Sequence, residues 1–160
     1  MLKLSKLIYL ADRSFMERYD CPILRDKFVS MEHGPVNSVT LNLINGLIAD
    51  PANEWNEFIS NRSTNYDVGL IRDNLDVDEL DELSEAEIEV LSDIADQFKG
   101  WNQYRVRDYT HKHCPEWEDP DGSSTPIDHA RVFEVLGKAE PQALADAVEE
   151  ERALSELPTA

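Results

Sequence analysis

Apolar residues recur at spacings of three and four along several segments of the 160-residue chain, and this periodicity limits the possible folds more than any other feature. The spacing places apolar side chains on one face of an α-helix, whereas a half-buried strand shows strict alternation. The pattern predicts a mainly α-helical protein whose first helix covers residues 2–19. The predicted inner stripe of this helix consists of Leu4, Leu7, Ile8, Ala11 and Phe15.

Proline and glycine mark where the early helical segments end. Pro22 disfavours helical geometry in the residue before it, so the first helix is predicted to end near Asp20. Residues 22–34 have an extended character, and Gly34-Pro35 interrupts the chain before a second helix. The apolar positions of that second helix are Val39, Leu43, Ile44, Leu47 and Ile48.

The middle of the chain contains weaker patterns and one clear helix start. A short helix is predicted within residues 53–61, and residues 65–72 are typical of a strand that forms a small hairpin with the earlier extended segment. Ser84 and Glu87 form a capping box, in which the serine accepts from a backbone N–H and the glutamate reaches back. A further helix is predicted over residues 103–113.

Two more helices are predicted toward the C-terminus. Thr125 suits a helix cap and Pro126 the first helical position, so one helix is predicted to begin there. Residues from Glu140 onward form an acidic amphipathic helix, which either docks on the domain or remains a mobile tail. The expected organisation is one compact domain over residues 1–138, with a small β-hairpin or short strand element, followed by an acidic helix or tail over residues 139–160.

Charge is distributed unevenly along the chain, whose net charge is −18. Residues 1–66 hold 8 acids and 7 bases, whereas residues 67–160 hold 25 acids and 8 bases. Such an acidic field repels phosphate backbones, so direct nucleic-acid binding is disfavoured. It favours a basic protein as partner, because complementary charge accelerates association. A purely solvated surface, as in salt-adapted proteins, is the competing interpretation.

Composition indicates a soluble globular protein in the cytoplasm. No run approaches the roughly 20 apolar residues of a membrane span, and no cleavage site follows the N-terminal segment. With only Cys21 and Cys114, the sequence indicates no disulfide framework, which suits a reducing compartment.

Candidate catalytic and metal-binding residues are few. His111, His113 and Cys114 are close in sequence, but two histidines two positions apart point in different directions on a helix. Cys21 lacks the local signature of a thiol nucleophile, and phosphate loops, nucleophile elbows and His-Glu-x-x-His motifs are absent from the sequence. The sequence therefore predicts a protein that is not an enzyme and has no cofactor, with a small metal-dependent hydrolase as the less favoured alternative.

Three tryptophans are candidates for partner contacts. Tryptophan is enriched at the energetic centres of protein interfaces, although it fills the edge of a core more often. Both interpretations stay open for Trp55, Trp101 and Trp117.

Four segments together resemble a known protein family. They are "KLIYLADRSFMERYDCPI", "DKFVSMEHGPVNS", "LSEAEIEVLSDIADQF" and "DYTHKHCPEW", in the order and approximate spacing of the Panacea domain. This is the SocA-like antitoxin domain, also found in phage-associated proteins of the GepA type. The resemblance spans residues 4–136 and implies a mostly helical domain with a small strand element. It also implies an antitoxin that binds its toxin directly and, in the best-known case, delivers it to a ClpXP-type protease.

The candidate site residues, most of which lie in the family motifs, form two groups. Lys6, Asp12 and Arg13 of the first motif are interpreted as a buried polar network, because buried charges require partners. The complete scaffold group is Lys6, Asp12, Arg13, Pro22, Asp26 and His111, and the candidate partner-binding residues are Tyr9, Glu32, His33, Gly34, Pro35, Trp101 and Trp117.

This sequence departs from the family pattern at two places. The usual Thr-Gly after Pro-Ile is Leu24-Arg25 here, although glycine adopts backbone angles that these residues avoid. The aromatic residue usual before Gly-Pro is His33, which implies a more polar and pH-sensitive contact.

We expect this chain to be the antitoxin of a type II-like toxin–antitoxin system that binds and neutralises a cognate toxin with a basic surface. No attachment of this chain to a membrane is expected. The alternative is a phage or mobile-element adaptor that has no toxin.

Overall fold

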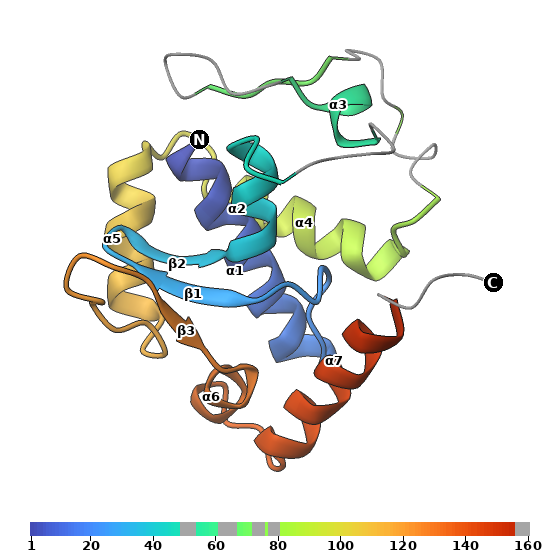
Figure 1. Cartoon of the computed structure of the whole chain (residues 1–160), viewed down its shortest axis with the longest axis vertical. Coiled ribbons are helices and arrows are strands. Elements are labelled where there is room, and N and C mark those ends of the chain that lie inside the picture. Colours follow the sequence, from blue (N-terminus) through green and yellow to red (C-terminus); the bar gives the residue numbers. More distant parts are fainter. Residues whose placement is uncertain (49–53, 61–66, 72–75, 77–80, 156–160) are drawn as a thin grey trace.

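Helix α1 (Leu2–Tyr19) runs through the middle of the molecule, and the other elements are arranged around it (Figure 1). The computed structural model describes residues 1–48, 54–60, 67–71, 76 and 81–155. Along the chain, α1 is followed by β1 (Phe28–Met31), β2 (Gly34–Asn37), α2 (Ser38–Ile44), α3 (Glu54–Phe58), α4 (Glu85–Gln97), α5 (Gln103–His113), β3 (Thr125–Ile127), α6 (His129–Val135) and α7 (Pro141–Ser155). The predicted fold class, mainly helical with a short strand element, is confirmed.

The bounds of α1 agree with the sequence prediction, but its buried face differs from the predicted stripe. Leu4 is exposed, and Leu7 and Ile8 are only partly buried. Ala11 and Phe15 of the predicted stripe are buried, and the other buried positions are Ser5, Lys6, Tyr9, Leu10, Asp12 and Met16. The prediction was wrong here because α1 is packed on several sides and meets polar partners that are distant in sequence.

The sheet has three antiparallel strands in the order β2-β1-β3. Phe28 pairs with Asn37 on one side and with Ile127 on the other. The predicted hairpin between β1 and residues 65–72 is wrong for the described part of that segment, which contributes only an isolated bridge between Ile59 and Leu70. Residues 65, 66 and 72 lie outside the described residues.

The helix predicted to begin at Thr125-Pro126 begins later. These two residues belong to β3, and α6 starts at His129, with the Asp128 carboxylate accepting from the backbone N–H of Ala130 at 2.8 Å. Pro126 lies in an edge strand, where its missing N–H removes no bond of the sheet ladder. Pairing with β1 and burial of Ile127 therefore prevail over the local capping pattern.

Helices α4 and α5 follow their predicted limits. The capping box at Ser84 is present, with the hydroxyl accepting from the backbone N–H of Glu87. Asn102 caps α5, whose bounds are the predicted residues 103–113. Helix α2 is shorter than predicted because it ends at Ile44, which leaves Leu47 and Ile48 exposed.

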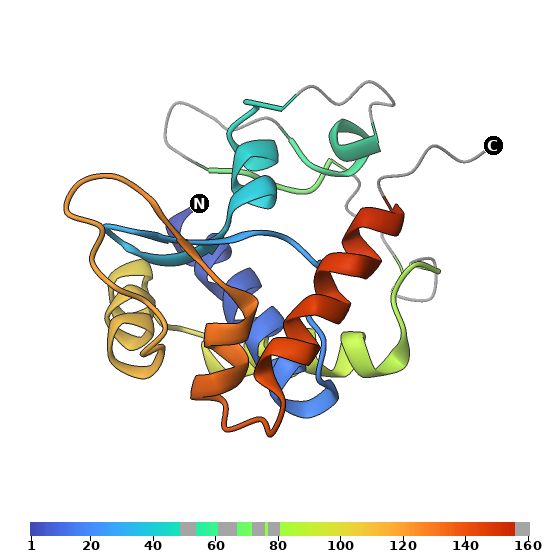
Figure 2. The ribbon, with the colours of Figure 1, turned by 60° about the horizontal axis from the view of Figure 1, so that its bottom comes forward.

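One core joins the sheet to the helices, and the C-terminal helix takes part in it. Helix α7 docks beside α6 (Figure 2) and buries Ala145 and Val148. The largest fully buried apolar side chains include Phe28, Phe98 and Phe133. Among the described residues, no helix is both long and apolar enough to span a bilayer.

Candidate partner-binding site

The turn between β1 and β2 projects from the sheet and carries two exposed side chains. Glu32 and His33 occupy this turn, while Gly34 and Pro35 behind them are buried. Gly34 has φ +100°, and a Cβ atom there would lie 2.7 Å from Thr110 Oγ1 and 3.3 Å from His111 Cδ2. Only glycine satisfies both the backbone angle and the close approach to α5. The turn therefore has a fixed position on the scaffold.

Helix α1 holds β2 just behind the turn through a buried lysine. Lys6 is 1 % exposed, and its Nζ donates to the carbonyl oxygen of Pro35 at 3.0 Å. Burial lowers the pKa of Lys6 to about 7, because the ammonium has lost most of its hydration. Lys6 forms no ion pair with a carboxylate in the described part of the chain.

The segment after α5 braces the other side of the turn. Trp117 donates from Nε1 to the carbonyl oxygen of Met31 at 2.9 Å, and Ser30 Oγ accepts from the backbone N–H of Glu118. The His111 and Trp117 rings stack with their centroids 4.0 Å apart. Desolvation and the nearby charges of Arg107 and Lys6 lower the pKa of His111, which favours the neutral imidazole in this stack.

A second polar network anchors this bracing segment to α1. Glu116 is buried and accepts from the Tyr9 hydroxyl at 2.6 Å and from Arg13 Nε at 2.7 Å. Burial and the adjacent Glu116 carboxylate raise the pKa of Tyr9 well above its usual value, so the phenol remains a donor. This network fixes the distance between α1 and the chain that follows α5.

Two aspartates organise the chain on either side of the sheet. Asp12 accepts from the backbone N–H of Leu24 at 3.0 Å and from Asn37 Nδ2 at 2.5 Å. Its pKa is raised to about 6, mainly by burial. Asp26 accepts from the backbone N–H groups of Val39 and Thr40 at 2.9 and 2.8 Å, and so caps α2 from outside the helix.

An apolar pocket of about 200 Å³ lies next to the exposed turn. Its lining consists of Met1, Leu2, Ser5, Lys6, Met31, Glu32, His33, Val36 and Leu41. Most of these side chains are aliphatic, and they suit an apolar side chain better than a polar ligand. We define the hairpin site as the exposed pair Glu32 and His33 together with this pocket.

The predicted partner-binding residues fall into three classes of exposure. Glu32 and His33 are exposed, whereas Trp101 and Trp117 are partly buried. Tyr9, Gly34 and Pro35 are buried, so they support the hairpin site from beneath its surface. Trp101 lies at the start of α5, separate from the hairpin site, where its ring meets those of Phe98 and Tyr109.

The predicted scaffold residues all take part in the interior. Lys6, Asp12 and Arg13 do not bond to one another; each has its own partner in a different segment, respectively Pro35, Asn37 and Glu116. Pro22 is fully buried, and Asp26 and His111 make the contacts described above.

The three residues of the alternative metal-site interpretation do not converge. His111 stacks on Trp117, while His113 stacks on Tyr109 with centroids 4.3 Å apart. Cys114 is buried, and burial raises the pKa of its thiol to about 12. Within the described ranges, no group of three His, Cys, Asp or Glu side chains is placed to hold a metal ion.

Sequence reasoning missed Glu116, the residue that ties together Tyr9 and Arg13. Its position in the sequence gives little indication of burial, because it is one of 33 acids and follows a proline beyond a helix end. Asn37, whose side chain is the partner of Asp12, was also missed.

Comparison with protein families gives one match. The family model described as antitoxin SocA-like, Panacea domain, matches residues 4–118. Comparison with curated proteins and with solved structures gave no match. The matched region contains most of α1, all elements from β1 to α5 and the hairpin site except Met1 and Leu2 of its pocket, but it ends before β3.

Proposed function

The chain belongs to the family of antitoxin SocA-like proteins with a Panacea domain, and from this premise we propose that it neutralises a toxin protein by direct binding through the hairpin site. The observation that carries the proposal is the bracing of the β1–β2 turn. Contacts from α1, α5 and Trp117 hold its base, while Glu32 and His33 face solvent beside an apolar pocket.

A fixed, exposed turn suits recognition because little conformational entropy is lost when a partner binds. An apolar side chain of the toxin fills the pocket, and polar groups beside it pair with Glu32 and His33. This combination of an apolar centre and a polar rim is typical of protein interfaces.

Charge supports a toxin with a basic surface. Helix α4 exposes Glu85, Glu89 and Asp96, and α7 adds further exposed acids such as Glu150. Within the acidic range 67–160, residues 72–75, 77–80 and 156–160 lie outside the described residues. An acidic surface accelerates encounter with a basic partner more than it slows dissociation.

The proposal is tested by inducing each gene adjacent to this one, alone and together with this chain. We expect growth arrest that co-expression relieves, with the two proteins co-purifying. Glu32→Ala combined with His33→Ala should weaken both rescue and co-purification. Ser92→Ala, an exposed change on α4 that alters no charge, is the control and should leave both unchanged. No toxicity from either neighbour would instead favour an adaptor role without a toxin.

Delivery to a ClpXP-type protease is the finer mechanism that the family resemblance suggests. It predicts that the toxin disappears faster when this chain is present, and only in cells that contain the protease. Stable toxin in a tight complex would indicate neutralisation by masking.

A further inference from the structure

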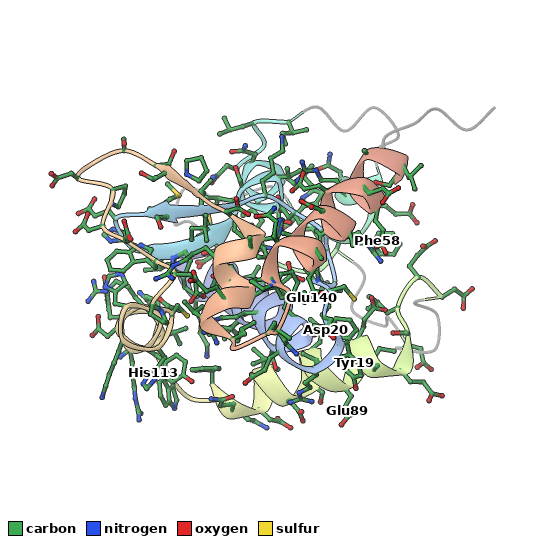
Figure 3. The ribbon with its side chains drawn as sticks, turned by 90° about the horizontal axis from the view of Figure 1, so that it is seen from below. Tyr19, Asp20, Phe58, Glu89, His113 and Glu140 are labelled. Atoms are coloured by element: carbon green, nitrogen blue, oxygen red, sulfur yellow. The ribbon has the colours of Figure 1, made fainter. Side chains whose placement is uncertain are left out.

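Helix α5 and the residues before it form a basic region in an acidic protein. Residues 99–113 contain Lys99, Arg105, Arg107 and Lys112 but one acid, Asp108, whereas the whole chain has 15 bases and 33 acids. Helix α5 lies at one edge of the molecule, and Figure 3 looks along it with His113 on the outer side. The inner face of the helix buries Val106 and Thr110, whereas Arg105 and Lys112 are exposed and Arg107 is partly buried.

Arg105 is held in place without a carboxylate. Its guanidinium lies 3.8 Å from the centre of the Trp101 ring, and Arg105 is exposed. Within the described residues, the Arg105 side chain forms no ion pair and donates no hydrogen bond. Stacking on the indole leaves the N–H donors at the edge of the guanidinium plane available for a carboxylate.

Neighbouring rings and charges extend this surface. Tyr104 is 56 % exposed, and the Arg107 guanidinium lies 5.5 Å from the centre of its ring. Behind Arg105, the Trp101 ring packs edge-on against Phe98 and Tyr109 at 5.1 and 5.9 Å. The Trp101 platform is therefore preorganised, which reduces the ordering cost of binding.

We propose that the α5 face, defined as Trp101, Tyr104, Arg105, Arg107 and Lys112, docks a carboxylate-bearing segment of the protein partner. The inference rests on the proposed function. It adds to the acidic surface a second contact region, which is basic. Trp, Tyr and Arg are the residue types enriched at the energetic centres of interfaces, and here Tyr104 and Arg105 are exposed beside the partly buried Trp101. The unpaired Arg105 supplies the charge complementarity.

The net charge of the chain decides between two kinds of acidic ligand. A nucleic acid carries a negative charge at every phosphate, so a protein of net charge −18 repels it over its whole length. A protein partner can carry a few carboxylates on a surface that is otherwise basic. Its carboxylates would then pair with the α5 face, and its basic residues with the acidic surface of this chain.

The first experiment needs no toxin. The isotope-labelled full chain is titrated at low salt with a glutamate-rich peptide that carries one phenylalanine, while its amide resonances are followed. We expect selective shifts in residues 101–113, and their loss in Arg105→Glu. Absence of these shifts would overturn the inference. Tighter binding of a short oligothymidine at the same amides would also overturn it, in favour of nucleic acid.

The second experiment uses the partner identified by co-expression. Arg105→Glu should lower affinity for that partner by about tenfold or more, and Arg105→Lys should have an intermediate effect because it keeps charge but loses planar stacking. The matched control is Arg131→Glu on α6, which makes the same charge change at an exposed arginine.

The two proposals fail in distinguishable ways. Unchanged affinity of Arg105→Glu for a partner that binds the natural chain would overturn the α5 inference and leave the proposed function standing. If no neighbouring protein binds the natural chain, the proposed function fails, and the peptide titration alone decides whether the α5 face receives carboxylates.

Discussion

Replacement of Lys6 by methionine tests whether a buried charge limits the stability of this fold. Lys6 is 1 % exposed, and burial lowers its pKa from 10.5 to about 7. The folded state therefore disfavours the ammonium, and by linkage stability rises with pH between the folded and unfolded pKa values. The penalty is absent above the unfolded pKa, grows as the pH falls, and is complete below about pH 7.

The size of the effect follows from the pKa change. A shift from 10.5 to about 7 corresponds to about 5 kcal/mol at acidic pH. Methionine has a similar length and no charge, so Lys6→Met removes this penalty. It also leaves the Pro35 carbonyl oxygen without its donor, which costs about 1 to 3 kcal/mol. We expect a net gain of about 2 to 4 kcal/mol at pH 6.

The assay is urea unfolding followed by circular dichroism at pH values from 6 to 9. As the pH rises from 6 to 9, the free energy of unfolding of the natural chain should increase by about 3 kcal/mol relative to that of Lys6→Met, because the variant lacks the titrating group. The control is Lys112→Met, which removes an exposed lysine and should leave the pH profile unchanged. Parallel profiles for the natural chain and Lys6→Met would refute the reasoning.

Three further substitutions test the scaffold. Gly34→Ala should lower stability by about 1 to 3 kcal/mol because of backbone strain, and further because the new Cβ clashes with Thr110. Gly46→Ala is the control, because Gly46 has φ +67° but open space around it and should show the strain alone. Equal losses of stability in thermal unfolding would argue against the clash. Arg25→Gly should stabilise the protein by up to about 1 kcal/mol, because Arg25 has φ +52° and glycine adopts this angle without strain. The variant loses an exposed ion pair with Glu151, which contributes little. A clear loss of stability would contradict this reasoning. Glu116→Gln should lower the free energy of unfolding in urea by about 3 kcal/mol. Arg13→Met should cost less stability when it is added to Glu116→Gln than when it is made in the natural chain. Strict additivity of the two effects would show that the pair is uncoupled.

Periodicity and capping predicted much of the helical framework. Helix α1, the capping box at Ser84 and the limits of α5 depend on residues close in sequence, so local patterns suffice. Strand β3 depends on pairing with β1, nearly one hundred residues earlier in the chain, and nothing near Thr125 encodes that partner. Local propensity therefore predicted a helix where long-range pairing forms a strand.

The same distinction applies to the candidate site. Gly34-Pro35 indicated a break in the chain before the second helix, but both residues pair with β1 as part of β2, and the exposed turn consists of the two residues before them. The burial of Lys6 agrees with the sequence interpretation, but its partner Pro35 was not predictable, and neither was the burial of Tyr9 against Glu116, because these residues become neighbours only in the folded chain. Replacement of the usual glycine by Arg25 indicated a different turn geometry, because arginine avoids the backbone angles of glycine, yet Arg25 has φ +52°, in the left-handed region.

The position of β3 matters for moving this module between proteins. The family match ends at residue 118, yet Ile127, Phe133 and Val148 belong to the same core as Phe28. A transplant cut at the edges of the match would carry Glu32 and His33 of the hairpin site but leave Phe28 without its cover. Recombination between relatives must therefore transfer β3, α6 and α7 together with the matched region, or supply another segment that covers Phe28 with equal apolar area.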